Sequence, residues 1–378
     1  MNHDKVRAIY QDQRIAEEFC NFKCEYCEGF CPTEYSLKKD KFGNLNVPIE
    51  WYKQMKSFPD EVQSFFKNGR SISEFYNIAT GVMNESKKIL NTDILKISGG
   101  ELTINPELCD FVKSVHKDYL MVQILTNGFK LSEADIKKYK EMGNITFQIS
   151  LDGVSVETNY SKSHSSFITK RVVDNVKLLL NYGIGVEINC VLTKYNTDKF
   201  LGFLKYFKDA KGLVIVPRPV RGEPRTVLDF NDEQIIEFEN CIKNYYKDFQ
   251  NILPPLEYFN RLISLMKFKV RKHKCYVPYF VQSIDGYGRY EKCPLGMQYD
   301  KYFNILDSSV DKNDILINSN YASNENNSIC KYCMTQYEIL NLFVDGVINE
   351  QELKKMSSLN NDIIIEHISE IKQKVLKK

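Results

Sequence analysis

The chain has 378 residues, enough for two or three domains and a large hydrophobic core. Its 51 Lys and Arg residues nearly balance its 49 Asp and Glu residues, which argues against a general nucleic-acid or membrane-surface binder. It has no run of 18 apolar residues and no apolar stretch typical of a secretory signal, so we expect a cytoplasmic protein without a transmembrane helix.

The first 230 residues alternate between short apolar runs and longer amphipathic stretches. The apolar runs predict a first strand near residues 14–19 and then strands over 93–98, 121–126, 145–150, 185–193 and 212–217. The amphipathic stretches predict helices over 106–119, 133–142 and 169–183. Strand, helix and parallel strand at this spacing indicate repeated βαβ units. Six such units would form an α/β fold, an open, partial (β/α)6 TIM-like barrel over residues 1–230, with a long insertion at 31–92.

The chain changes character after residue 230. Asn231 is a good helix N-cap and begins a helical pattern that Pro254 and Pro255 interrupt, and a second helix is expected over 257–269. We therefore expect a helical linker over 231–274. A small, loop-rich domain over 275–335 and C-terminal helices over 336–378 would complete the chain.

The eleven cysteines are unusual, because a disulfide framework suits short secreted proteins rather than a chain of this length. In a reducing compartment, clustered cysteines more often bind metal or take part in redox chemistry. Four of them lie within residues 20–31 and four within residues 275–333. These two groups predict two metal or redox sites.

The strongest chemical signal is Cys20-Asn-Phe-Lys-Cys24-Glu-Tyr-Cys27, a C-x3-C-x2-C loop. Three thiolates in so short a loop can hold three irons of a [4Fe–4S] cluster and leave the fourth iron open to another ligand. Structural zinc sites usually use C-x2-C pairs and four ligands, so the spacing disfavours zinc. Cys31, just beyond the loop, is either a further ligand, a reactive thiol or a buried core cysteine.

This loop and a Gly-Gly-Glu sequence about 75 residues later resemble the radical S-adenosylmethionine (SAM) superfamily. Ser98-Gly99-Gly100-Glu101 follows a predicted strand, and glycines there let a ligand approach the backbone closely. The resemblance implies that SAM chelates the open iron and is cleaved by one electron to a 5′-deoxyadenosyl radical, which takes a hydrogen from the substrate. It also implies that the Ser98–Glu101 turn holds the SAM amino group and that Tyr26 lies near the adenine.

Polar residues at every second position of the predicted strands mark the face that looks into the barrel. Helices should cover the opposite, apolar face. The resemblance makes Ser150, Asp152 and Asn189 SAM-binding residues, and Asn127 in the Thr126-Asn127-Gly128 turn could also touch SAM. The alternative for these residues is an internal hydrogen-bond network.

Two groups of cationic residues have alternative roles. Related peptide-modifying members usually carry an Arg-Gly pair before the helix that follows the fourth strand, whereas this chain has Lys162 and, further on, Arg171. Either of them, or neither, would meet the SAM carboxylate. Beyond the sixth strand, Arg218, Arg221 and Arg225 could bind a substrate carboxylate or phosphate, or form a solvated loop.

The second cysteine group reads Cys275-x17-Cys293 followed by Cys330-x2-Cys333, and four thiolates complete a [4Fe–4S] site. The spacing is similar to the twitch domain, a shortened relative of the SPASM domain, which implies one auxiliary cluster. The alternative is a four-cysteine zinc ribbon. Some family members place an Asp base directly after the second of these cysteines, but Pro294 stands there, so no catalytic base is assigned.

These features indicate a radical SAM oxidoreductase with a SAM-binding [4Fe–4S] cluster, SAM and an auxiliary [4Fe–4S] cluster. The motifs look closest to members that oxidise, crosslink or epimerise peptide side chains. A small-molecule dehydrogenase acting on a sugar alcohol or aminoglycoside is the second hypothesis, and a non-catalytic metal-cluster scaffold is the third. An electron donor such as flavodoxin or ferredoxin is the expected partner, and neither a membrane nor nucleic acid is expected.

Overall fold

The computed structural model describes residues 6–15, 20–27, 72–222, 225–286, 288–291, 303–307 and 328–377. Cys31, Cys293 and most of the expected insertion at 31–92 lie outside these ranges. Among the helices that are described, none is both long enough and apolar enough to cross a membrane.

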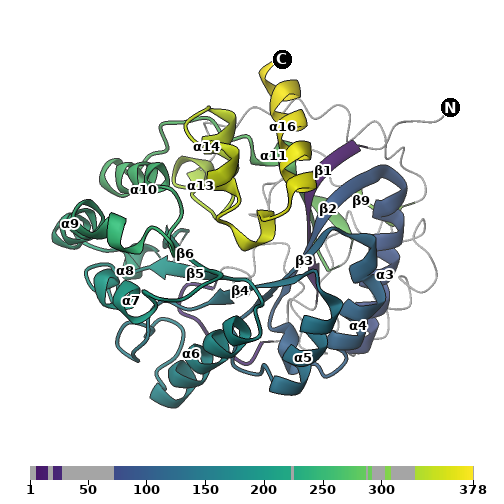
Figure 1. Cartoon of the computed structure of the whole chain (residues 1–378), viewed down its shortest axis with the longest axis horizontal. Coiled ribbons are helices and arrows are strands. Elements are labelled where there is room, and N and C mark those ends of the chain that lie inside the picture. The colour runs from purple at the N-terminus through teal and green to yellow at the C-terminus, as the bar shows by residue number, and fades with distance from the viewer. Residues whose placement is uncertain are drawn as a thin grey trace, which may run out of the picture.

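One nine-stranded sheet organises the chain, in the order β6-β5-β4-β3-β2-β1-β7-β8-β9. The strands are β1 (Val6–Ile15), β2 (Leu90–Gly99), β3 (Met121–Thr126), β4 (Ile145–Ser150), β5 (Val186–Leu192), β6 (Leu213–Pro219), β7 (Val281–Ile284), β8 (Arg289–Glu291) and β9 (Phe303–Asn304). All neighbouring strands from β6 to β7 in this order pair in parallel. β8 pairs antiparallel with β7, and β9 pairs antiparallel with β8. The sheet curves into an open half-barrel, so the expected α/β partial barrel is confirmed (Figure 1).

Two strands differ from the expectation. β1 occupies Val6–Ile15 rather than 14–19, because its Gln11, Asp12 and Gln13 are buried polar residues that weaken the apolar pattern. A seventh parallel strand, β7, pairs with β1. It has only four residues within a loop-rich segment, so it carries almost no periodic signal.

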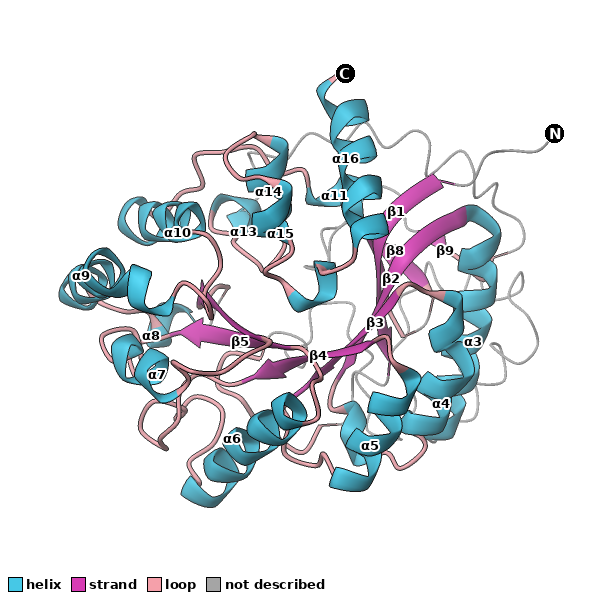
Figure 2. Ribbon diagram, in the orientation of Figure 1, coloured by secondary structure: helices cyan, strands magenta, loops and turns pink. Residues whose placement is uncertain are grey.

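Helices follow the parallel strands and cover the convex face of the sheet (Figure 2). They include α3 (Ile72–Ile89), η2 (Leu102–Ile104), α4 (Leu108–Val115), η3 (His116–Asp118), α5 (Glu133–Met142), α6 (Ser166–Asn181), α7 (Phe200–Tyr206), α8 (Arg225–Leu228), α9 (Asp232–Phe249) and α10 (Leu256–Phe268). The apolar strand face meets them as expected: the ring of Phe147 on β4 lies 5.3 Å from that of Tyr139 on α5. Asn231 caps α9 through a complete capping box with Gln234, which confirms the predicted helix start.

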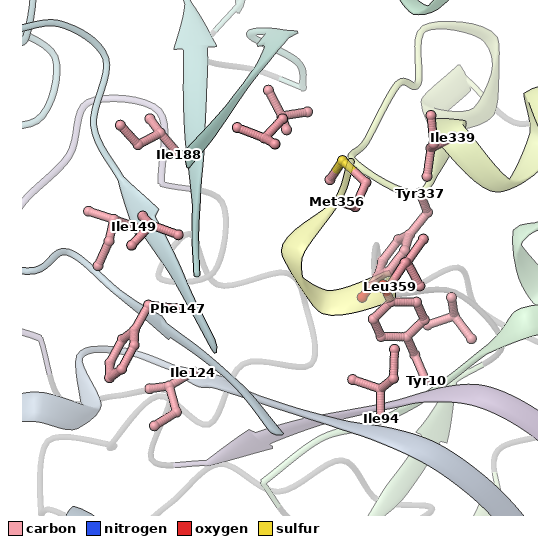
Figure 3. Close-up of a cluster of buried hydrophobic side chains, with 14 of the residues drawn as sticks. Tyr10, Ile94, Ile124, Phe147, Ile149, Ile188, Tyr337, Ile339, Met356 and Leu359 are labelled. Atoms are coloured by element: carbon pink, nitrogen blue, oxygen red, sulfur yellow. The ribbon is translucent and has the colours of Figure 1, made fainter. Parts of the chain in front are cut away.

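The C-terminal helices are α11 (Val277–Phe280), α13 (Ser328–Lys331), α14 (Glu338–Val344), α15 (Glu350–Leu353), η4 (Ser357–Leu359) and α16 (Asp362–Leu376). The segment around η4 lies on the concave side of the sheet (Figure 1). Ser358 donates from its backbone N and its Oγ to Glu187 Oε1, at 2.9 and 2.7 Å. Tyr10, Tyr337 and Leu359 gather at the same place (Figure 3), and the rings of Tyr10 and Tyr337 lie 5.0 Å apart. The end of the chain therefore fills the base of the half-barrel.

Candidate active site

The cysteine loop lies across the carboxyl ends of β3 and β4. Asn127 Nδ2 donates to Asn21 Oδ1 at 2.8 Å, and the backbone N of Glu25 donates to Ser161 O, also at 2.8 Å. Tyr26 OH donates to Asp152 Oδ2 at 2.5 Å. The carboxyl ends of parallel strands are where α/β proteins place their ligand sites.

The three cysteines of this loop and the strand ends line one cavity of about 300 Å³, at the lower end of the range for small-molecule sites. Eight of the nine predicted cofactor-binding residues belong to its wall: Tyr26, Ser98, Gly99, Gly100, Glu101, Asn127, Ser150 and Asn189. Asp152 does not line it. The wall also contains three cations, Lys162, Arg218 and Arg221.

Gly99 is required by the neighbouring strand. It pairs with Ile15 at the end of β1, and a Cβ at this position would stand 1.8 Å from Ile15 O and 2.9 Å from Ile15 C. No side chain fits against a backbone carbonyl at that distance. The glycine therefore lets β1 and β2 end side by side, immediately before the cysteine loop and the Gly-Gly-Glu turn.

Glu101 ties the end of β2 to the end of β3. Its Oε1 accepts hydrogen bonds from Thr103 N at 3.0 Å and Thr126 Oγ1 at 2.6 Å, and its Oε2 accepts from Asn127 N at 2.6 Å. Burial raises the pKa of the Glu101 carboxyl, and the hydrogen bonds from Thr103 and Thr126 oppose that rise. Much of the carboxylate's hydrogen-bonding capacity is thus used within the protein, which fixes the Thr126-Asn127-Gly128 turn.

Asp152 anchors the cysteine loop through its hydrogen bond with Tyr26. Besides Tyr26, it accepts a hydrogen bond from Val191 N at 2.8 Å, and Lys162 Nζ lies 3.9 Å from its Oδ1. Burial raises the pKa of Asp152, and the charge of Lys162 opposes this. Lys162 Nζ also lies 5.0 Å from the centre of the Tyr26 ring, an arrangement that permits a cation–π interaction. Arg171, the other candidate cation, is exposed on α6 and does not line the cavity.

The chemistry of the donor set fits an iron–sulfur cluster with a polar ligand beside it. Burial raises the pKa of Cys24 to about 11, so the free thiol stays protonated at neutral pH until a metal displaces the proton. In the part of the chain that is described, no three Cys, His, Asp or Glu side chains converge on a single metal ion. The thiolates of a [4Fe–4S] cluster each bind a different iron, so they need not converge. Asn189 Oδ1 is buried on the cavity wall and has no hydrogen-bond partner among the described residues, and a polar ligand such as SAM would supply one.

A buried charged layer lies directly beneath the cavity. Ser98 Oγ donates to Asp12 Oδ1 at 3.3 Å, and Tyr337 OH donates to Asp12 Oδ2 at 3.0 Å. Lys96 Nζ lies 4.6 Å from the centre of the Tyr337 ring, and burial lowers the pKa of Lys96 to about 8. Asp12 was not among the predicted site residues, because β1 was expected near residues 14–19.

The structure describes three cysteines of the second group, Cys275, Cys330 and Cys333. Arg271 donates from Nη2 to Cys333 O at 2.7 Å and from its backbone N to Lys331 O at 2.7 Å, which docks it on the Cys330–Cys333 turn. Burial raises the pKa of the Cys333 thiol, the charge of Arg271 opposes this, and Cys275 adds to the rise. The structure therefore brings Cys275 and Cys333 into one neighbourhood. Cys293 lies outside the described residues, so a four-thiolate site stays a prediction.

Comparisons with known proteins agree with the fold and with the resemblance to radical SAM enzymes. Residues 79–207 match the family model described as the radical SAM superfamily. Over 200 residues the chain is 26% identical to the GTP 3′,8-cyclase of Aliarcobacter butzleri, covering 52% of this chain and 51% of that protein. Over 235 residues it is 26% identical to the 7,8-dihydro-6-hydroxymethylpterin dimethyltransferase of Methanocaldococcus jannaschii, covering 59% of this chain and 44% of that protein. The chain thus spans about half the length of the curated relatives it matches.

Solved structures share the half-barrel. Streptococcus suis SuiB bound to S-adenosylmethionine superposes with a TM-score of 0.57 at 13% identity, covering 83% of this chain and 67% of that chain. The AdoMet-bound protein anSMEcpe gives a TM-score of 0.51 at 18% identity, covering 82% of this chain and 81% of that chain. At these identities the likeness concerns the fold.

Proposed function

Because the chain carries a radical SAM domain, a family that implies an enzyme using a [4Fe–4S] cluster and SAM, we propose that it reductively cleaves SAM to abstract a hydrogen from a peptide side chain. The observation that carries this proposal is the single cavity that Cys20, Cys24 and Cys27 share with the Ser98–Glu101 turn at the carboxyl ends of the strands. When bound, the cluster supplies an electron and SAM supplies the 5′-deoxyadenosyl radical.

The protein's own residues orient these groups and keep water away from them. Cys20, Cys24 and Cys27 would hold the cluster. Tyr26 would cover the adenine, its hydroxyl fixed by the buried Asp152. Asn189, whose Oδ1 has no partner in the described part of the chain, would accept a hydrogen bond from a ribose hydroxyl or another donor of SAM.

An auxiliary cluster held by Cys275, Cys293, Cys330 and Cys333 is the second part of the proposal. The proximity of Cys275 and Cys333 supports it, as does the cationic surrounding of Arg271 and Arg221, which suits the negative charge of a four-thiolate cluster. Such a cluster could accept an electron from the substrate, which would make the overall reaction an oxidation.

The peptide substrate is supported by structural neighbours that were solved with a peptide: SuiB with the precursor peptide SuiA, and anSMEcpe with the Cp18Cys peptide. A small-molecule substrate is the second candidate, because the curated relatives are named for reactions on GTP and on a pterin. Incubation of reduced enzyme and SAM with peptides encoded beside its gene, and separately with GTP, separates the two. Loss of two hydrogens or a crosslink in a peptide supports the first, and conversion of GTP alone overturns it.

The core of the proposal is tested by anaerobic reconstitution and by measuring 5′-deoxyadenosine after reduction with dithionite. The native enzyme should release it, and Cys24→Ala should abolish the release because the open-iron cluster is lost. Cys241→Ala is the matched control, since Cys241 is buried in α9 outside the cavity. If Cys24→Ala cleaves SAM at the native rate, the assignment of the cysteine loop is wrong.

The cluster count has its own measurement. Two [4Fe–4S] clusters correspond to about eight irons per chain, of which about four should remain after Cys20, Cys24 and Cys27 are all replaced by Ala. Stoichiometric zinc in protein produced with sufficient iron would contradict the auxiliary cluster and leave the SAM-binding cluster in place.

A further inference from the structure

We infer that Arg271 is a positioning residue for the auxiliary cluster, which joins the two halves of the second cysteine group and raises the reduction potential of a cluster bound there. The two halves are the segment around Cys275 and the Cys330–Cys333 turn. The inference rests on the second part of the proposed function, the four-thiolate site. Cys275, Cys330 and Cys333 are free thiols, as cluster ligands must be. Arg271 lies between α10 and α11, and only 8% of its side chain is exposed.

The guanidinium of Arg271 is docked on the Cys330–Cys333 turn. Its Nε and Nη2 both donate to Cys333 O, at 3.1 and 2.7 Å, and its backbone N donates to Lys331 O at 2.7 Å. The side chain of Cys275 is a further hydrogen-bond partner of the guanidinium. Arg271 thus connects the two halves of the second cysteine group, which are far apart in sequence.

A buried carboxylate holds the guanidinium in place. The side chain of Glu338 is fully buried, and its Oε2 lies 3.3 Å from Arg271 Nη2. Asn341 Nδ2 donates to the same Oε2 at 2.9 Å, and Asn341 Oδ1 accepts from Tyr276 N at 2.7 Å. Glu338 therefore fixes Arg271 and, through Asn341, the backbone next to Cys275.

The local charges decide the sign of the effect, although Arg271 is paired with Glu338. Burial raises the pKa of the Cys333 thiol, and the charge of Arg271 opposes this rise more strongly than that of Arg221 does. The charge of Glu338 adds to the rise in pKa, but by less than Arg271 opposes it. Arg271 therefore favours negative charge at Cys333 despite its own carboxylate partner.

A cluster bound at these cysteines would gain one negative charge when it is reduced. The reduction potential of an iron–sulfur cluster depends on nearby charge, on hydrogen bonds to the cysteine sulfurs and on exposure to solvent. A guanidinium that is shielded from water and hydrogen-bonded to Cys275 and Cys333 stabilises this added charge, because electrostatic attraction is stronger in a buried site. Arg271 should therefore raise the potential of the auxiliary cluster.

The position of this site gives the raised potential a purpose. The charge of Arg221 acts on Cys333, and Arg221 also lines the cavity, so the second cysteine group borders on the place where a substrate radical would form. A higher potential favours transfer of one electron from that radical to the auxiliary cluster. In this step the cluster gains the electron, the substrate radical becomes the oxidised product, and one proton leaves to water.

The test measures the midpoint potential of the auxiliary cluster by electron paramagnetic resonance during an anaerobic redox titration of the reconstituted, full-length enzyme. Replacing Cys20, Cys24 and Cys27 by Ala removes the SAM-binding cluster and so identifies the auxiliary signal. Two clusters correspond to about eight irons per chain, which are counted in every variant.

Arg271→Gln should lower the midpoint potential by at least about 59 mV, a tenfold change in the ratio of reduced to oxidised cluster for one electron, while the iron content stays native. Arg271→Lys should lower it by a smaller amount, since the charge stays but the fork is lost. Lys272→Gln removes the same charge from the exposed neighbouring residue and is the matched control, with the native potential. Arg271→Gln leaves Glu338 paired with Arg261 at 2.7 Å, so the buried carboxylate keeps a cation.

The inference is overturned if Arg271→Gln holds both clusters at the native potential. It is also overturned if Arg271→Gln loses iron while the auxiliary cluster that remains keeps the native potential, because the arginine would then be purely structural. If Arg271→Gln does not fold, a native potential for Arg271→Lys overturns it. About four irons per chain in the native enzyme would instead refute the auxiliary cluster itself, and the role of Arg271 with it.

Discussion

Replacement of Gly99 by Ala should disturb the point at which β1, β2 and the cysteine loop meet. The added Cβ would stand 1.8 Å from Ile15 O, whereas real Cβ atoms essentially never approach a heavy atom within 3.0 Å, so the two strands must separate by more than about 1 Å. The obstructing atom is a backbone oxygen within the β1–β2 ladder and cannot rotate away. Overpacking of this kind costs about 1–3 kcal/mol of folding free energy. A displacement of about 1 Å near the reacting groups can also cost about a hundredfold in rate.

The matched control is Gly81→Ala, the same substitution in the interior of α3, where an added Cβ meets nothing within 4 Å. It should stabilise the protein by up to about 1 kcal/mol, because Ala is the better helix former. The assays are the anaerobic thermal midpoint, iron content and 5′-deoxyadenosine release, each compared with the native enzyme. Native values for Gly99→Ala in all three assays would refute the close-contact reasoning.

Three further outcomes are expected. Burial lowers the pKa of Lys96 to about 8, below the roughly 10.4 of an unfolded chain, so the folded state is penalised most below pH 8 and less as the pH rises. Lys96→Met should therefore gain stability relative to the native enzyme as the pH falls from 10 to 7, by up to about 3 kcal/mol; a pH-independent difference in unfolding free energy would contradict this. Ser358→Ala should cost about 1–3 kcal/mol by leaving the buried Glu187 carboxylate short of donors. Ser369→Ala, which removes an exposed hydrogen bond to Glu350, should cost almost nothing in the same denaturation experiment. Asn231→Ala should lose about 1 kcal/mol with the α9 cap, and equal urea midpoints for variant and native protein would show that the cap is dispensable.

Local sequence patterns were sufficient wherever one segment determines its own structure. The helix over 133–142 has the predicted bounds because Ser132 caps its start and Gly143, with φ of +82°, ends it. The strands over 121–126 and 145–150 also have the predicted bounds, since their apolar runs are short and flanked by turn residues. The cysteine loop is likewise local, because its ligands lie within eight residues.

Side-chain direction at the strand ends could not be predicted in the same way. The sequence grouped Asp152 with Ser150 among the inward-facing SAM-binding residues, but β4 ends at Ser150 and the alternation of side chains no longer applies beyond it. Asp152 turns to Tyr26 and Val191 instead of the cavity. Glu101 also faces partners on another strand, which no pattern within its own segment reveals.

Sequence patterns predicted the cysteine and Gly-Gly-Glu motifs and most of the half-barrel, because ligand spacing and strand periodicity are properties of neighbouring residues. Two features came from the tertiary structure alone: Gly99 faces Ile15, and the C-terminal segment around Ser358 fills the barrel base at Glu187. Each of these depends on contacts between residues far apart in sequence. Such contacts follow from strand order and sheet curvature, which local patterns do not encode.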